Sequence, residues 1–141
     1  MSAKFFIDTN VLIYAVDAAD KRKQAIALQW LAEAHETDAG IVSYQVVQEW
    51  FNVVLRKAAV PMSLQMARSI YERLIQPLWR VQSSRELLEA ALDMQQLEFL
   101  SWWDSLIVSA AIQGGCSQLL TEDLQHGRTI RTVKITNPFQ P

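Results

Sequence analysis

Short apolar runs alternate with longer amphipathic stretches along this chain. Strands buried on both faces of a sheet are predicted at residues 5–7, 40–43 and 118–121. Two more strands are predicted at residues 79–82 and 129–135, the second from the alternation at Val133 and Ile135. Because predicted helices separate most of these five strands, the sequence indicates an α/β fold with a mostly parallel sheet.

Capping residues and helix breakers set the predicted helix boundaries. Asp20 and Ser43 can each accept a hydrogen bond from a free backbone N–H at the start of a helix. Capping boxes are predicted at Ser83 with Glu86 and at Ser101 with Asp104. Helices are accordingly expected at residues 10–16, 20–36, 44–57, 63–77, 83–96 and 101–113.

Length and composition fit a single globular domain covering residues 1–141. Half of the residues are hydrophobic, and no apolar run approaches the ~18 residues that a membrane helix needs. The single cysteine, Cys116, rules out an internal disulfide and fits a reducing, cytoplasmic setting. The net charge of -2 argues against a dedicated nucleic-acid binder, but it allows an enzyme that binds a polyanion through metal ions.

Acidic residues recur at the ends of predicted strands and in the first turns of predicted helices. Asp8 and the pair Glu122–Asp123 follow strands, Asp104 lies at a helix start, and Glu49 lies early in the helix after the second strand. Each acid also has a structural explanation, such as the N-cap for Asp8 and an ordinary polar turn for Glu122–Asp123. Together, however, they are expected at one edge of a parallel sheet, where ligands bind in such folds.

Carboxylates gathered at one edge repel each other unless a cation neutralises them. Oxygen ligands suit a hard divalent ion, Mg²⁺ or Mn²⁺, and the two histidines, His35 and His126, lack the spacing of a zinc site. Such a metal can generate a hydroxide nucleophile and stabilise the charge on a phosphate. The sequence therefore favours metal-dependent hydrolysis of a phosphodiester.

The chain resembles the PIN-domain family, and most closely the VapC-type ribonuclease toxins of prokaryotic toxin–antitoxin pairs. The residues that carry the resemblance are Asp8-Thr9-Asn10, Glu49, Trp103-Asp104-Ser105-Leu106-Ile107 and Thr121-Glu122-Asp123. The resemblance implies a five-stranded parallel sheet flanked by helices, and an Mg²⁺- or Mn²⁺-dependent endoribonuclease with one or two ions. It also implies an RNA substrate, a cognate antitoxin protein and a homodimer, with no membrane association.

Carried over by position, the resemblance implies that Asp8, Glu49, Asp104 and Asp123 are catalytic metal ligands. It implies supporting polar roles for Thr9, Asn10 and Thr121. The sequence departs from the family after Asp123, where Gln125 and His126 stand, so Glu122 stays an alternative fourth ligand. Separately, the position of Arg128 close to the acidic turn makes it the first candidate for an RNA phosphate contact.

The same residues disfavour two other functions. A phosphatase of the haloacid dehalogenase type needs a second Asp two residues after the first, where this chain has Asn10. A phosphate-receiving signalling domain needs an acidic pair near the first strand, and Asp8 has no acidic neighbour. A PIN-like RNA-processing nuclease and a catalytically silent PIN-like interaction module remain the alternatives.

Overall fold

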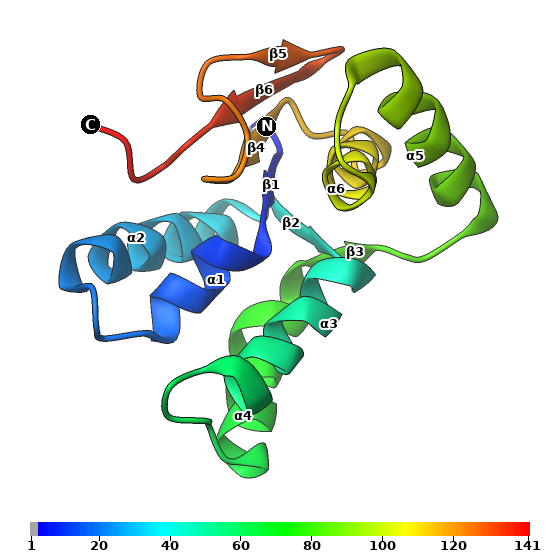
Figure 1. Cartoon of the computed structure of the whole chain (residues 1–141). Coiled ribbons are helices and arrows are strands. Elements are labelled where there is room, and N and C mark those ends of the chain that lie inside the picture. The colour runs from blue at the N-terminus through cyan, green and yellow to red at the C-terminus, as the bar shows by residue number, and fades with distance from the viewer. Residues whose placement is uncertain (1–2) are drawn as a thin grey trace.

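A six-stranded sheet forms the centre of the computed structural model, which describes residues 3–141 (Figure 1). The strands are β1 (Phe5–Ile7), β2 (Gly40–Ser43), β3 (Trp79–Val81), β4 (Gln118–Leu120), β5 (Thr129–Ile130) and β6 (Val133–Thr136). Their order is β3-β2-β1-β4-β6-β5, and every neighbouring pair is parallel except β5 with β6. The predicted α/β fold with a mostly parallel sheet is confirmed.

Helices cover both faces of the sheet, with α1 and α2 on one side and α5 and α6 on the other (Figure 1). The α-helices are α1 (Thr9–Val16), α2 (Lys21–Thr37), α3 (Tyr44–Asn52), α4 (Leu64–Ile70), α5 (Arg85–Glu98) and α6 (Trp102–Gln113). Two π-helical turns, η1 (Val53–Lys57) and η2 (Tyr71–Ile75), prolong α3 and α4, and the 3₁₀ turn η3 (Gln76–Leu78) leads into β3. No helix among residues 3–141 is long and apolar enough to cross a membrane.

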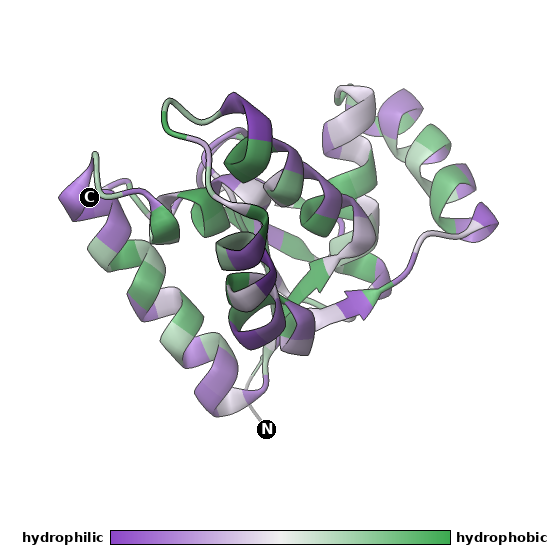
Figure 2. Cartoon of the chain, turned by 90° about the horizontal axis from the view of Figure 1, so that it is seen from below, coloured by the Kyte–Doolittle hydropathy of each residue, from purple (hydrophilic) through white to green (hydrophobic). Residues whose placement is uncertain are grey.

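The first strand lies at the middle of the sheet, between β2 and β4. Its residues are all buried, with Phe6 and Ile7 at 0% exposure, as expected for a strand covered by helices on both faces. Figure 2 shows that α2, the long helix at the left, instead carries both hydrophobic and hydrophilic positions along its length. The carboxyl end of β1 is therefore held rigidly inside the molecule.

The structure corrects the sequence prediction near the C-terminus. The single strand predicted at residues 129–135 is a hairpin of β5 and β6, which raises the number of strands from about five to six. Arg131 adopts φ of 54°, in the left-handed region that the turn requires. An arginine gives no turn signal in the sequence, since glycine or asparagine usually occupies such positions.

Two helix boundaries also differ from the prediction. Ser84 rather than Ser83 caps α5, because the Ser84 hydroxyl accepts the backbone N–H of Leu87 at 3.1 Å. The helix predicted to end at Pro77 passes through η2 and η3, with Pro77 inside the first turn of η3, where its missing N–H costs no hydrogen bond. The capping roles of Asp20, Ser43 and Ser101 are confirmed.

Gly40 marks a close approach of β2 to α2. A Cβ at Gly40 would lie 2.2 Å from the Cβ of Ala34 on α2, so no side chain fits there. We expect Gly40→Ala to lower the free energy of unfolding by about 1–3 kcal/mol, as overpacking in a core usually does. Urea denaturation of the wild type and the variant measures this difference.

The double variant Gly40→Ala/Ala34→Gly is the control for that experiment. Removing the opposing Cβ relieves the overlap, so the double variant should lose less stability than the sum of the two single variants. Strictly additive losses would show that the contact between β2 and α2 is not the cause.

Candidate metal-binding acidic site

Asp8 lies directly after β1 and is also the N-cap of α1. Its backbone N–H donates to the carbonyl of Leu120 at 3.0 Å, which fixes it to the end of β4. One carboxylate oxygen accepts the backbone N–H of Thr9 at 2.7 Å, and the other accepts the hydroxyl of Thr121, also at 2.7 Å. The capping role and a site at the sheet edge therefore coincide in one residue.

The electrostatic environment of Asp8 is unusual for a carboxylate. The residue is only 5% exposed, and this burial raises the pKa of Asp8 to about 7. The hydrogen bonds from Thr121 and Thr9 oppose the rise, whereas the negative charges of Asp123 and Glu49 add to it. A neighbouring cation would offset both the cost of ionising the buried carboxyl group and its repulsion by the other acids.

Glu49 on α3 is joined to Asp8 through Thr9. The hydroxyl of Thr9 donates to Glu49 Oε2 at 2.9 Å, while the Thr9 backbone N–H donates to Asp8. Gln45, one turn earlier on α3, donates from Nε2 to Glu49 Oε1 at 2.7 Å. Glu49 is thus partly buried and held by donors on both oxygens, rather than being a freely solvated residue beside the core stripe.

Asp104 and Asp123 lie near the same acids. Asp104 is in the first turn of α6, where its backbone N–H donates to the hydroxyl of the N-cap Ser101 at 3.1 Å. The pKa of Asp123 is raised by partial burial of its carboxyl and then by the charge of Asp104, while a hydrogen bond from Asn10 opposes the rise. Asp123 therefore lies within electrostatic reach of Asp104, and of Glu49 as well.

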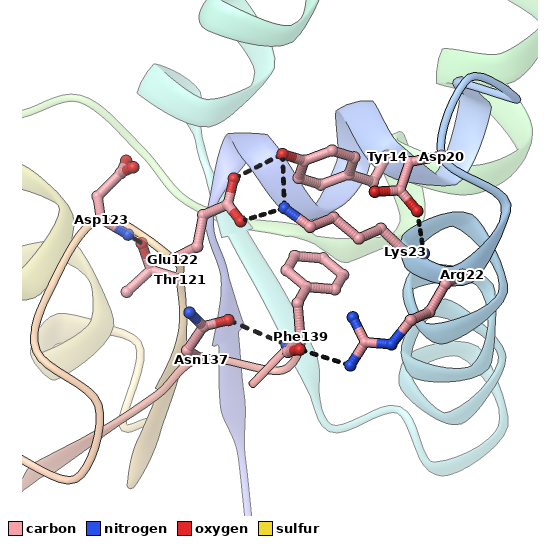
Figure 3. Close-up of polar contacts among 9 residues, drawn as sticks. All are labelled: Tyr14, Asp20, Arg22, Lys23, Thr121, Glu122, Asp123, Asn137 and Phe139. Carbon is pink, nitrogen blue, oxygen red and sulfur yellow. Dashed lines mark hydrogen bonds and ion pairs between the residues drawn. The ribbon is translucent and has the colours of Figure 1, made fainter. Parts of the chain in front are cut away.

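Glu122 is directed to the other side of the turn after β4 (Figure 3). Its two oxygens accept the hydroxyl of Tyr14 at 2.7 Å and the ammonium of Lys23 at 3.0 Å. The ion pair with Lys23 balances the charge of Glu122. The Lys23 ammonium also lies 4.6 Å from the ring centroid of Tyr14. Asp123 points away from the cluster in Figure 3. Sequence reasoning missed Tyr14 and Lys23, because their distance from Glu122 along the chain gives no signal.

The donor set fits a hard divalent cation in chemical type. It consists of the carboxylate oxygens of the four acids, together with a buried Asn10 Oδ1 that has no hydrogen-bond partner. Within residues 3–141, however, no three Asp, Glu, His or Cys side chains are grouped tightly enough to hold an ion. The oxygens of Asp8 and Glu49 are instead turned toward the hydroxyl and N–H donors described above.

Arg128 is engaged by Glu98. Its guanidinium donates to the backbone carbonyl of Glu98 at 3.2 Å and to the Glu98 carboxylate at 3.3 Å, at the end of α5. An RNA phosphate would have to compete with Glu98 for this side chain. The phosphate contact of Arg128 stays a prediction.

The raised pKa of Asp8 makes the stability of the protein depend on pH. In chelator, an unfolded Asp8 loses its proton near pH 3.8 and the folded one near pH 7, so the folded protein becomes less stable as the pH rises between these values. Asp8→Asn removes this dependence and should increase the free energy of unfolding at pH 8 by up to about 4 kcal/mol. Thermal melts from pH 4 to pH 8 measure the effect.

Asp93→Asn is the matched control, because Asp93 is exposed on α5. The melting temperature of Asp93→Asn should change with pH in the same way as that of the wild type. If the curves of wild type and Asp8→Asn run parallel from pH 4 to pH 8, the carboxyl of Asp8 is not the group responsible.

Solved structures with similar folds were found across nearly the full length of the chain. A toxin–antitoxin complex from Klebsiella pneumoniae contains a chain that is 18% identical, with a TM-score of 0.63 and coverage of 97% of this chain and 98% of that one. The sarcin–ricin loop cleaving toxin VapC20 of Mycobacterium tuberculosis is also 18% identical, with a TM-score of 0.60 and coverage of 85% and 92%. VapBC2 of Rickettsia felis, bound to a DNA fragment from its promoter, matches at 18% identity with a TM-score of 0.61 and coverage of 93% and 96%.

The sequence comparisons complete the assignment. No curated protein matches the chain in sequence. The family model of the PIN domain matches residues 5–131, which include all the acids described above. The six-stranded α/β fold, with its acids at the carboxyl edge of the sheet, agrees with that match. The chain belongs to the PIN domain family.

Proposed function

We propose that this protein is a metal-dependent endoribonuclease that hydrolyses RNA phosphodiester bonds as the toxin of a prokaryotic toxin–antitoxin pair. The observation that carries the proposal is the placement of four acids at one edge of the sheet in a PIN-family chain: Asp8 after β1, Glu49 in α3, Asp104 in the first turn of α6 and Asp123 in the turn after β4. A similar fold occurs in VapC20, which is named as a toxin that cleaves the sarcin–ricin loop. That likeness supports RNA as the substrate class.

The four acids would hold Mg²⁺ or Mn²⁺, as one or two ions. When bound, such a cation supplies a water of lowered pKa and positive charge beside the phosphate. Residues of the chain orient the carboxylates: Thr121 and Thr9 hold Asp8, and Thr9 also holds Glu49. Asn10 supports Asp123 and offers an additional oxygen beside it.

The geometry favours Asp123 over Glu122 as the fourth ligand. Both oxygens of Glu122 are engaged by Tyr14 and Lys23, and a ligand role would require breaking an ion pair. Asp123 lies close enough to Asp104 and Glu49 to be affected by their charges. Glu122 then acts by anchoring the turn that carries Asp123.

The proposed partners are a cognate antitoxin protein and a second copy of the chain, in the cytoplasm. The similar structure from Klebsiella pneumoniae supports an antitoxin, because it is a toxin–antitoxin complex. Arg128 would contact RNA by releasing the carboxylate of Glu98 and pairing with a phosphate instead.

Purified protein should cleave structured RNA with Mg²⁺ or Mn²⁺ and stop when a chelator is added. Asp8→Asn should lower the rate by at least about 100-fold, because a neutral amide binds a hard cation poorly. Gel analysis of single-turnover cleavage measures the rate, and Asp93→Asn should match the wild type.

Calorimetric titration with Mn²⁺ accompanies the cleavage assay. Metal binding without cleavage of any RNA would argue for a PIN-like protein with another substrate. Absence of both cleavage and metal binding would contradict the nuclease proposal and favour an interaction module.

Two substitutions distinguish Glu122 from Asp123 as the fourth metal ligand. Asp123→Asn should weaken Mn²⁺ binding clearly more than Glu122→Gln does, because Asp123 would bind the ion directly whereas Glu122 acts only through the turn that carries Asp123. Calorimetry at one pH measures both. The opposite ranking would assign the ligand to Glu122.

A further inference from the structure

A hollow of about 640 Å³ opens directly beside the acidic site. It is lined by Thr9 and Glu49 of the site, by Gln45, Gln48 and Asn52 of α3, by Lys57 of η1 and by Trp103 of α6. Its volume is within the range of small-ligand sites in proteins. Any group that occupies it lies next to the carboxylates.

Trp103 is the tryptophan that differs from the others. Trp50 is buried in the core, and Trp30, Trp79 and Trp102 pack against the core, whereas Trp103 is 63% exposed. Its indole also lines a second, smaller hollow of about 120 Å³, which shares Gln45 and Gln48 with the first. Trp103 therefore stands between two hollows, one residue before the acid Asp104.

The polar groups around the hollow can recognise a base edge. Gln48 and Asn52 are four residues apart and so lie on one face of α3. Each amide offers both donors and an acceptor, and no side-chain hydrogen bond engages either one within residues 3–141. Lys57 adds one exposed positive charge at the same hollow, where a phosphate could pair with it.

We propose that this hollow binds an unpaired nucleotide of RNA next to the scissile phosphate. The base stacks on the indole of Trp103, its edge meets the amides of Gln48 and Asn52, and a backbone phosphate contacts Lys57. The inference rests on the proposed function and deepens it, because it names the residues of this chain that would hold the nucleotide beside the cleaved bond. A base inside a duplex is stacked on its neighbours and cannot reach the indole.

An exposed tryptophan could instead pack against a second copy of the chain. Glu49 and Lys57 in the lining argue against that occupant, because Glu and Lys are depleted at the core of protein–protein interfaces. The protein interface is therefore one outcome of the test below.

Binding of fluorescein-labelled RNA in chelator tests the proposal without requiring hydrolysis. Trp103→Ala should weaken binding of a single-stranded oligonucleotide about tenfold or more, and Trp103→Phe should recover most of that loss, as expected for stacking. Affinity for a duplex of matched sequence should change less than twofold. Anisotropy titration at fixed salt measures each dissociation constant.

Phe99→Ala is the matched control, because Phe99 is a 91% exposed aromatic residue that does not line either hollow. It should bind RNA like the wild type. Stacking is checked independently with 2-aminopurine in the oligonucleotide, whose fluorescence should be quenched by the wild type but not by Trp103→Ala.

The outcomes separate this inference from the nuclease proposal. Single-stranded RNA binding that depends on Trp103, without any cleavage, would support the inference and contradict the nuclease. Cleavage and binding that are unchanged in Trp103→Ala would overturn the inference alone. A Trp103→Ala protein that binds RNA normally but sediments as a smaller species would assign Trp103 to an interface between copies. Absence of RNA binding in chelator by a wild-type protein that cleaves RNA with Mg²⁺ would overturn the inference alone, whereas absence of both binding and cleavage would overturn both.

Discussion

The position of β1 between β2 and β4 is the constraint on which the acidic site depends. Parallel pairing on both sides buries the strand and leaves Asp8 at its carboxyl end with little access to water. The same pairing aligns the end of β4, so that Thr121 reaches the Asp8 carboxylate. A carboxylate placed there is costly to ionise, which is the property that a cation-binding site needs.

Much of the fold could be predicted because its signals are local. The caps at Asp20, Ser43 and Ser101 work within one turn, and the apolar runs report burial directly. The hairpin at Arg131 could not be predicted, since its left-handed conformation is imposed by the pairing of β5 with β6. Ser83 and Ser84 are adjacent serines, and the hydrophobic pattern does not fix the start of a helix to within one residue.

For the acidic site, the sequence predicted where the acids lie along the chain but not where their side chains point. The positions of Asp8, Glu49 and Asp104 relative to strand ends and helix starts indicated a common edge of the sheet. The side to which each carboxylate turns depends on contacts between distant segments. Glu122 illustrates this, because Lys23 on α2 determines its direction and lies on the far side of the chain in sequence. Composition likewise gave no sign that Trp103 differs from the other tryptophans.

The cluster in Figure 3 joins both ends of the chain to the acidic turn. Phe139 packs edge-on against Tyr14, with ring centroids 4.9 Å apart, and its carbonyl accepts the guanidinium of Arg22 at 2.7 Å. Tyr14 in turn contacts Glu122. A bulky group attached near Phe139 would therefore disturb the contacts that hold the turn carrying Asp123. The point at which the protein is tagged, fused or immobilised is consequently a variable of its chemistry.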